Sequence, residues 1–243
     1  MARLVGRTLQ RDDRTAGDRM SFRRFGGVVF DCDGVLLDSN RIKAGIFRDI
    51  LAGHPGDAVA AFTAYQQAHP GLHRRDLFAY FFTEIAPQVD FRDQTDRCVS
   101  EFSRRTLDAL GGCAAVPGAL ELVARLHNEG VPCVVVSAAE AADLAVLLGG
   151  RGIAHRLGAI RGGDRKKADH VLDLLAAGVI ARPLLYFGDS RADLDAAEAV
   201  QARFVMVSGA SDWADGAEIC RRRGHDVVPD LRDVERALFA VDL

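Results

Sequence analysis

The sequence contains very little lysine. Lys43, Lys166 and Lys167 are the only lysines among 31 basic residues, so arginine carries almost all of the positive charge. The formal net charge of -3 provides no general electrostatic attraction to nucleic acid. We therefore expect no nucleic-acid partner, and each of the rare lysines becomes a candidate for a specific role.

Long apolar runs and paired cysteines are also missing. No stretch reaches the roughly 18 consecutive apolar residues of a membrane-spanning helix, and the N-terminus has no apolar segment of the secretory type. The cysteines show neither CxxC nor Cys/His metal-ligand spacing; they are Cys32, Cys98, Cys113, Cys133 and Cys220. The sequence therefore predicts a cytoplasmic protein with reduced thiols and no membrane partner.

At 243 residues, the chain can bury one substantial core and carry a second small domain. Residues 1–20 are polar and lack hydrophobic periodicity, which predicts a flexible tail. Four apolar runs are typical of buried strands: 28–30, 133–136, 184–187 and 204–207. Helical patterns lie between the later runs, at 119–128, 139–148 and 167–177. Strands that alternate with helices indicate an α/β fold with a doubly wound parallel sheet.

Residues 39–112 break this alternation, because they show no strong strand pattern. Helices are expected there at 42–51, 58–68, 75–85 and 94–110. A helical block inserted after the first strand predicts a cap domain over residues 39–112. The core domain would then comprise residues 21–38 and 113–243. The chain is expected to be a monomer or a homodimer.

Polar side chains follow the predicted strands at their carboxyl ends. Asp31 and Asp33 follow the first apolar run, Ser137 follows the second, and Asp189 follows the third. Ligands of open parallel sheets bind at this edge, so we expect these side chains to converge. Ser137 alone would more often be a turn or helix-cap residue.

The paired acids predict a metal site. Asp31 and Asp33 crowd two negative charges at one strand end, which is costly unless a cation binds or one acid keeps its proton. Mg²⁺ suits such a site because it takes oxygen ligands together with water and substrate phosphate. An isolated DxDG is more often a surface turn, but GDSRADLDAA supplies a second acidic cluster, in which Asp189 is the expected ligand. Asp193, four residues later, is expected to brace a ligand or a lysine.

Lys166 and Lys167 follow a glycine-rich turn and precede a predicted helix. Such a pair is usually a solvated patch. A phosphoryl site, however, needs an ammonium group to offset charge on the phosphate oxygens. In a chain so poor in lysine, both interpretations stay open.

Four segments, FDCDGVLLDSN, VVVSAAE, KKAD and FGDSRAD, resemble in this order the motifs of the haloacid dehalogenase superfamily of phosphohydrolases. The resemblance extends from about residue 25 to the end of the chain. It implies that Asp31 is the nucleophile and Asp33 the general acid and base. It also implies that Ser137 and a lysine hold the phosphoryl group, and Lys167 fits the start of the motif helix better than Lys166.

The resemblance further implies a Mg²⁺ ion held by the Asp31 carboxylate, the Asp33 backbone carbonyl and Asp189, with Asp193 supporting. Dehalogenation is disfavoured, because the dehalogenase branch lacks an acid at the position of Asp33.

Within the expected cap, HPGLHRRDLFAYFF resembles the substrate-specificity loop of family members of the β-phosphoglucomutase and phosphoglycolate phosphatase type. Gly71 and Arg74 match that loop, while His73 stands where serine is usual. The resemblance implies that these three residues bind substrate. The alternative is an exposed, basic helix N-terminus.

The expected activity is Mg²⁺-dependent hydrolysis of a small phosphate ester, a sugar phosphate or related phosphometabolite, through an aspartyl phosphate. A sugar phosphomutase would use the same Asp31 and Asp33 and is the nearest alternative. A non-catalytic binding protein on the same fold is a more remote one.

Overall fold

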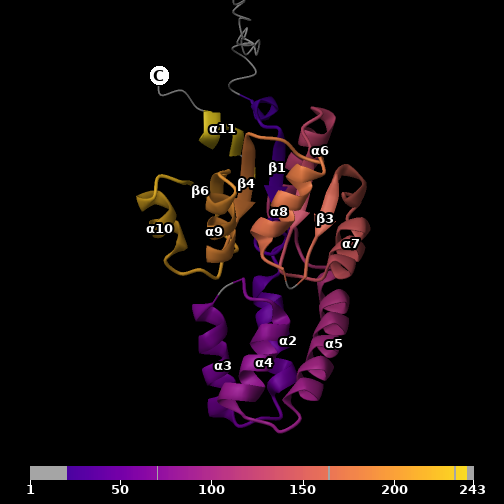
Figure 1. Cartoon of the computed structure of the whole chain (residues 1–243), viewed down its shortest axis with the longest axis vertical. Helices are drawn as coiled ribbons and strands as arrows, with labels where there is room; N and C mark the ends of the chain where they lie inside the picture. The colour runs from indigo at the N-terminus through magenta and orange to yellow at the C-terminus, as the bar shows by residue number, and fades with distance from the viewer. Residues whose placement is uncertain (1–20, 70, 164, 233, 240–243) are drawn as a thin grey trace, which may run out of the picture.

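The computed structural model describes residues 21–69, 71–163, 165–232 and 234–239, so the predicted tail at 1–20 lies outside the described residues. A six-stranded, all-parallel sheet forms one half of the molecule (Figure 1). Its strands are β1 (Gly27–Phe30), β2 (Cys133–Val136), β3 (Ala159–Arg161), β4 (Leu184–Gly188), β5 (Arg203–Val207) and β6 (Asp226–Val228). Their order is β3-β2-β1-β4-β5-β6. The connections therefore run outward in both directions from β1, which places the switch point between β1 and β4.

The sheet is covered on both faces. Val28 and Phe30 of β1 belong to one apolar cluster and Val29 to the other, because successive strand residues point to opposite faces. The first cluster includes residues of α6 (Ala119–Asn128), α7 (Ala141–Gly150) and α11 (Val234–Phe239). The second includes residues of α8 (Lys167–Ala176), α9 (Arg191–Ala199) and α10 (Gly216–Arg222). Short 3₁₀ turns occur at η1 (Phe22–Arg24) and η3 (Ala154–Arg156). The predicted doubly wound α/β fold is confirmed.

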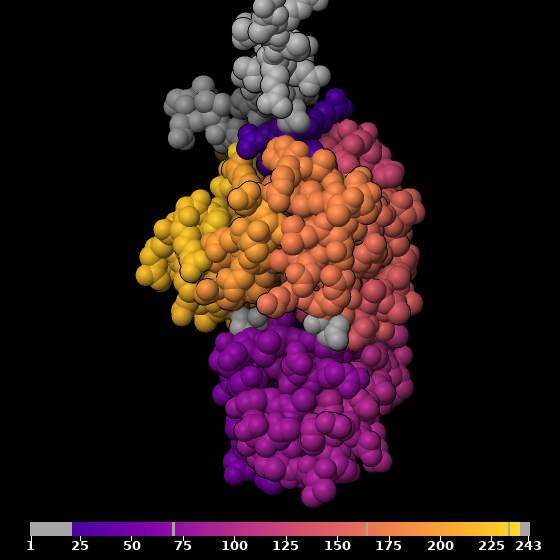
Figure 2. All heavy atoms as spheres, in the orientation of Figure 1, coloured from indigo at the N-terminus to yellow at the C-terminus, as the bar shows by residue number. Residues whose placement is uncertain are grey.

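Helices between residues 40 and 110 form the other half of the molecule, beyond the carboxyl edge of the sheet (Figures 1 and 2). They are α2 (Asn40–Leu51), α3 (Gly56–Ala68), α4 (Arg74–Tyr80) with the π-helical turn η2 (Phe81–Ile85), and α5 (Phe91–Leu110). They enclose a third apolar cluster that is rich in phenylalanine: Phe47, Phe62, Phe78, Phe81, Phe82 and Phe102. The inserted helical cap is therefore confirmed, and we refer to α2 to α5 as the cap.

Two strands of the sheet were not predicted from the sequence. β3 and β6 have three residues each and form the two edges of the sheet. Most of their residues are only partly buried, so no continuous apolar run marks them. The segment predicted as one helix at 75–85 is an α-helix that continues as a π-helical turn.

Within the part of the chain that the structure describes, no helix is long and apolar enough to cross a membrane. All five cysteines are free thiols.

Candidate active site

A cavity of about 720 Å³ lies between the carboxyl edge of the sheet and the cap. The structure brings together, in the wall of this one cavity, the residues that follow the strands and the favoured lysine: Asp31, Asp33, Ser137, Lys167 and Asp189. All four cap helices also contribute to its lining. The cavity therefore has a polar floor on the sheet and a roof made by the cap.

Asp31 directly follows β1 and is only 4% exposed. The Cys32 backbone N–H donates to its Oδ1 (2.7 Å), and its Oδ2 lies 2.9 Å from Lys167 Nζ. The Cys32 side chain packs into the apolar cluster on one face of the sheet, away from the site. Burial and the nearby Asp193 carboxylate raise the pKa of Asp31, and Lys167 opposes that shift.

Lys167 rather than Lys166 enters the site. Lys167 is the first residue of α8 and is buried, and its Nζ lies 2.7 Å from Asp193 Oδ1 as well as 2.9 Å from Asp31 Oδ2. Burial alone would lower the pKa of Lys167, but the two carboxylates outweigh it and the pKa ends above its usual value. Lys166 is exposed and does not line the cavity.

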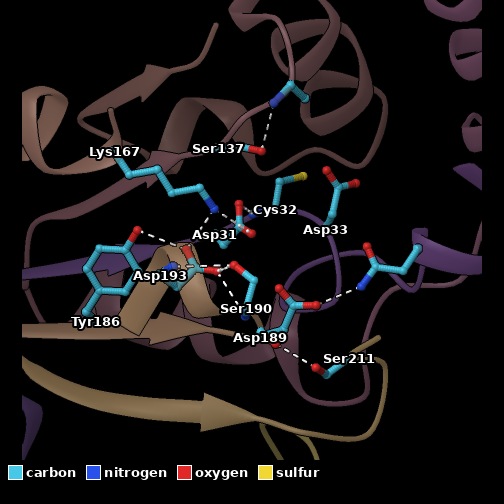
Figure 3. Close-up of polar contacts among 12 residues, drawn as sticks. Asp31, Cys32, Asp33, Ser137, Lys167, Tyr186, Asp189, Ser190, Asp193 and Ser211 are labelled. Atoms are coloured by element: carbon cyan, nitrogen blue, oxygen red, sulfur yellow. Dashed lines mark hydrogen bonds and ion pairs between the residues drawn. The ribbon is translucent and has the colours of Figure 1, made fainter. Parts of the chain in front are cut away.

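Asp193 is fully buried and holds Lys167 in place (Figure 3). Its Oδ1 accepts hydrogen bonds from Lys167 and from the Tyr186 hydroxyl (3.1 Å). Its Oδ2 accepts from the Ser190 hydroxyl (2.5 Å) and the Ser190 backbone N–H (3.2 Å). The Asp193 backbone N–H in turn donates to Ser190 Oγ (3.3 Å), which completes a capping box at the start of α9. Both oxygens are thus occupied by protein donors.

Asp189 ends up beside Asp31 because β4 lies next to β1. The Asn40 amide, at the first residue of α2, donates to Asp189 Oδ2 (2.7 Å). Gly34 allows this close packing: its φ is +72°, and a Cβ there would lie 2.1 Å from Asp189 Oδ2. Burial and the Asp31 carboxylate raise the pKa of Asp189 well above its usual range.

These residues fit a hard divalent cation. Carboxylate oxygens of Asp31, Asp189 and Asp193 lie within 4.8 Å of one another. Three buried carboxylates face one buried ammonium group, so the cluster lacks positive charge. Burial first, and then the neighbouring carboxylates, raise the pKa values of Asp31 and Asp189. Asp193 already accepts two hydrogen bonds on each of its oxygens. Each Asp31 oxygen has one protein donor, and Asp189 accepts from Asn40 on one oxygen, so both keep lone pairs for an ion that prefers oxygen ligands, such as Mg²⁺.

Asp33 points away from the pair formed by Asp31 and Lys167 (Figure 3). The Ser39 hydroxyl donates to its Oδ1 (2.5 Å), and its Oδ2 lies 2.5 Å from Lys43 Nζ, one turn into α2. Burial would raise the pKa of Asp33, but Lys43 and Ser39 outweigh it, and the pKa is lowered.

Sequence reasoning missed Ser39, Asn40 and Lys43 as members of the site. For Lys43 a signal was available, because it is one of only three lysines in the chain.

Ser137 follows β2 and is 2% exposed. Its Oγ accepts a hydrogen bond from the Ala139 backbone N–H (3.2 Å), which is the turn geometry expected of a serine after a strand. The hydroxyl proton can still be donated to a ligand in the cavity, which Ser137 lines.

Arg74 and His73 of the cap contact the sheet half through one ion pair and one polar contact of the imidazole ring. Arg74 is 5% exposed, and its Nη2 lies 3.0 Å from Asp143 Oδ2. His73 Nε2 lies 3.1 Å from Glu140 Oε1. Both acids lie at the start of α7. We call these two contacts, Arg74 with Asp143 and His73 with Glu140, the cap clasp.

The three residues predicted to bind substrate lie differently around the cavity. Gly71 and Arg74 line it, whereas His73 does not. Gly71 has a φ of +89°, and a Cβ there would lie 2.8 Å from Ala192 Cβ, so glycine lets the loop approach α9. Arg74 also donates to the Ser103 hydroxyl (2.7 Å), so its guanidinium group already has protein partners. Substrate binding by these three residues stays a prediction.

A buried carboxylate that opens into a capped cavity beside an ammonium group has a geometry suited to nucleophilic attack. Residues 28–207 match the family model of haloacid dehalogenase-like hydrolases. The chain belongs to this family, and the resemblance of its four ordered motifs is confirmed.

Two curated relatives support the assignment. Phosphoglycolate phosphatase from Pectobacterium atrosepticum is 28% identical over 210 residues, which cover 84% of this chain and 88% of the relative. Phosphoglycolate phosphatase from Cereibacter sphaeroides is 29% identical over 215 residues, which cover 84% and 96%. With the family match, these relatives make the chain an enzyme, a hydrolase of the phosphatase type.

Solved structures share the fold. CbbY from Rhodobacter sphaeroides in complex with phosphate superposes with a TM-score of 0.67 at 16% identity, covering 86% of this chain and 96% of that one. β-Phosphoglucomutase from Clostridium difficile gives a TM-score of 0.65 at 15% identity, covering 86% and 93%.

Proposed function

We propose that this chain is a Mg²⁺-dependent phosphatase that hydrolyses a small phosphate ester through a phosphorylated Asp31. The observation that carries the proposal is the buried Asp31 carboxylate, which lines the cavity 2.9 Å from the Lys167 ammonium group. Ser137 and Asp189 line the same floor. The names of the two curated relatives support phosphatase activity.

The reaction follows from the roles of the side chains. An oxygen of Asp31 attacks phosphorus and forms an aspartyl phosphate, while the bond to the ester oxygen breaks. Asp33 gives the departing oxygen a proton. Water then attacks the aspartyl phosphate and returns a proton to Asp33, which releases inorganic phosphate and restores the Asp31 carboxylate. Lys167 and Ser137 offset charge on the phosphoryl oxygens.

Asp33 must turn to perform this role, because its carboxylate is held by Ser39 and Lys43 on the side of the cap. These contacts come from the start of α2 and the residue before it. The orientation of the acid is therefore coupled to the position of the first cap helix. While the contacts persist, Asp33 is ionised and suited to act as a base.

Asp31, Asp189 and the backbone carbonyl of Asp33 would hold Mg²⁺. When bound, the ion supplies positive charge to the phosphoryl oxygens. Asp193 keeps Lys167 beside Asp31 by occupying the other side of its ammonium group.

A sugar phosphomutase would use the same nucleophile but pass the phosphoryl group to a sugar hydroxyl instead of water. The likeness to β-phosphoglucomutase, at 15% identity, favours neither activity. The cytoplasmic location and the monomeric or dimeric state also stay predictions.

Turnover of p-nitrophenyl phosphate by the purified chain, with and without Mg²⁺, tests the proposal. We expect phosphate release that depends on the metal. Incubation with glucose 1-phosphate, glucose 1,6-bisphosphate and Mg²⁺ separates the two activities, because a phosphatase liberates inorganic phosphate, whereas a mutase produces glucose 6-phosphate without releasing an equal amount of inorganic phosphate. Absence of phosphate release from every ester in a phosphometabolite panel, with Mg²⁺ present, would contradict the proposal.

A further inference from the structure

The roof of the cavity is rich in positive charge. Its arginine and lysine residues come from α2 and α4, and they are Arg41, Lys43, Arg48 and Arg74. Two of them are held by short ion pairs. Lys43 Nζ lies 2.5 Å from Asp33, and Arg74 Nη2 lies 3.0 Å from Asp143. The charge of each of these two cations is therefore already balanced by a carboxylate.

Arg41 and Arg48 differ in their surroundings. Arg41 interacts electrostatically with Asp212, another residue of the cavity wall. Arg48 is exposed, lines the cavity, and forms neither an ion pair nor a side-chain hydrogen bond with any residue that the structure describes. Its guanidinium group is therefore the cation of the roof with no acidic partner among the described residues.

The wall beside Arg48 adds uncharged donors. Phe47, which precedes Arg48 on α2, packs against Phe62 of α3 with ring centroids 5.6 Å apart. Gln66 and Gln67, about one helical turn after Phe62 on α3, line the same cavity. Amide N–H groups and a guanidinium group together form a surface suited to a carboxylate or a phosphate.

The position of Arg48 also limits what can reach it. Asn40, at the start of α2, contacts Asp189 on the cavity floor (2.7 Å). Arg48 lies eight residues further along, which corresponds to about 12 Å at the rise of an α-helix. Side chains in a helix lean toward its N-terminus, so Arg48 leans back toward the floor. A group that meets Arg48 while a phosphate lies at Asp31 must be several bonds from the phosphorus.

We propose that Arg48, assisted by Gln66 and Gln67, binds a second anionic group at the end of the substrate opposite to the transferred phosphate. The inference rests on the phosphatase function proposed above. The substrate is then a phosphate ester that carries a carboxylate or a second phosphate. Arginine suits this role because its planar fork can donate two parallel hydrogen bonds to either group.

Matched substrate pairs test the inference. 3-Phosphoglycerate and glycerol 3-phosphate differ by a carboxylate, and glucose 1,6-bisphosphate and glucose 1-phosphate differ by a second phosphate. kcat/KM for all four is measured with the unmodified chain, Arg48→Gln and Arg48→Lys. Arg97→Gln is the control, because Arg97 is an exposed arginine of the cap that does not line the cavity.

In each pair, one ester carries an additional anionic group, the carboxylate of 3-phosphoglycerate or the second phosphate of glucose 1,6-bisphosphate. We expect Arg48→Gln to lower kcat/KM for this ester in at least one pair by about 10- to 100-fold, as for loss of a charge-assisted contact. kcat/KM for the ester without the additional anionic group should change less than about twofold. Arg48→Lys should recover part of the loss. The pair that responds identifies the carboxylate or the phosphate as the ligand. Equal changes within both pairs would overturn the inference, since they would show that Arg48 serves only the last turn of α2.

Binding measurements keep this test independent of turnover. In calorimetric titrations of Asp31→Asn, the ester with the additional anionic group should bind more tightly than its partner in at least one pair. The double variant Asp31→Asn/Arg48→Gln should lose that preference. If the preference for the ester with the additional anionic group is absent, or survives the second substitution, Arg48 does not bind the distal group. If no ester in the panel is hydrolysed but the preference is present and depends on Arg48, the phosphatase proposal fails and the anion subsite stands.

Discussion

The sheet half and the cap use charged side chains in different ways. Asp31, Lys167 and Asp193 of the sheet half are each at most 7% exposed, and Lys167 contacts both carboxylates. The cap has a separate core of stacked and tilted phenylalanine rings, and its cations line the cavity roof. Two of them reach across to acids of the sheet half, and Arg48 faces the cavity without one.

We expect this difference to separate the residues that carry out the reaction from the residues that select the substrate. Groups buried together in the sheet half depend on each other, so a change to one alters the charge balance of all. A roof cation that belongs to a helix with its own apolar core can change with little effect on that balance. We therefore expect substitutions in the sheet half to affect every substrate, and substitutions at the roof to affect particular substrates.

The largest effect should come from the nucleophile. Asp31→Asn keeps the shape of the side chain but cannot form the aspartyl phosphate, so we expect phosphate release to fall by about three orders of magnitude or more on every ester. The melting temperature should not fall, because the amide removes one of three crowded carboxylates. Asp57→Asn, at an exposed aspartate of α3, is the control and should keep full activity. Residual turnover above about one per cent of the unmodified rate would contradict the nucleophile assignment.

The second-largest effect on turnover should come from removal of the metal. Treatment with EDTA should reduce turnover of p-nitrophenyl phosphate by about two orders of magnitude or more, and added Mg²⁺ should restore it. Thermal melting provides a second measurement, since an ion that binds the folded chain among crowded carboxylates raises its melting temperature as its concentration rises. Asp189→Asn should weaken that rise. Full activity after exhaustive chelation would exclude the metal site.

Asp193 should be important for stability as well as rate. Asp193→Ala leaves the buried Lys167 with Asp31 as its remaining acidic partner and leaves the Tyr186 hydroxyl without its acceptor. We expect the free energy of unfolding to fall by about 3–5 kcal/mol and kcat to fall by roughly 10- to 100-fold on all esters. Chemical denaturation and steady-state kinetics measure the two effects. Asp195→Ala, at an exposed position on the same helix, is the matched control. A normal rate in a folded Asp193→Ala protein would refute the positioning role.

The smallest effect should come from the cap clasp. If Arg74 mainly joins cap and sheet, Arg74→Ala and Asp143→Ala should each weaken turnover by roughly three- to tenfold, and the double variant should be no worse than either. If Arg74 instead grips the substrate, as its loop resemblance predicts, Asp143→Ala should leave turnover unchanged or improve it. In that case Arg74→Ala should weaken turnover of the natural substrate and spare p-nitrophenyl phosphate. The double-mutant cycle distinguishes the two roles.

Much of the fold could be predicted because its central strands are buried on both faces. Such strands need continuous apolar runs, and Cys133–Val136 was predicted with the bounds that the structure shows. The positions after these runs identified Asp31, Ser137 and Asp189 as neighbours, because parallel strands end at one edge. The edge strands β3 and β6 escaped, since a short and partly exposed strand needs no such run.

The sequence by itself determined the α/β class, the inserted helical cap and the family, all from local patterns and their order. Only the tertiary structure decided how the charges pair. Asn40 and Asp189 are separated by 149 positions, and Arg74 and Asp143 by 69. Whether such groups meet depends on how α2 and α4 pack over the end of the sheet, and no local pattern encodes that distance. For the same physical reason, only the structure separates the roof cations that already hold a carboxylate from Arg48, which faces the cavity.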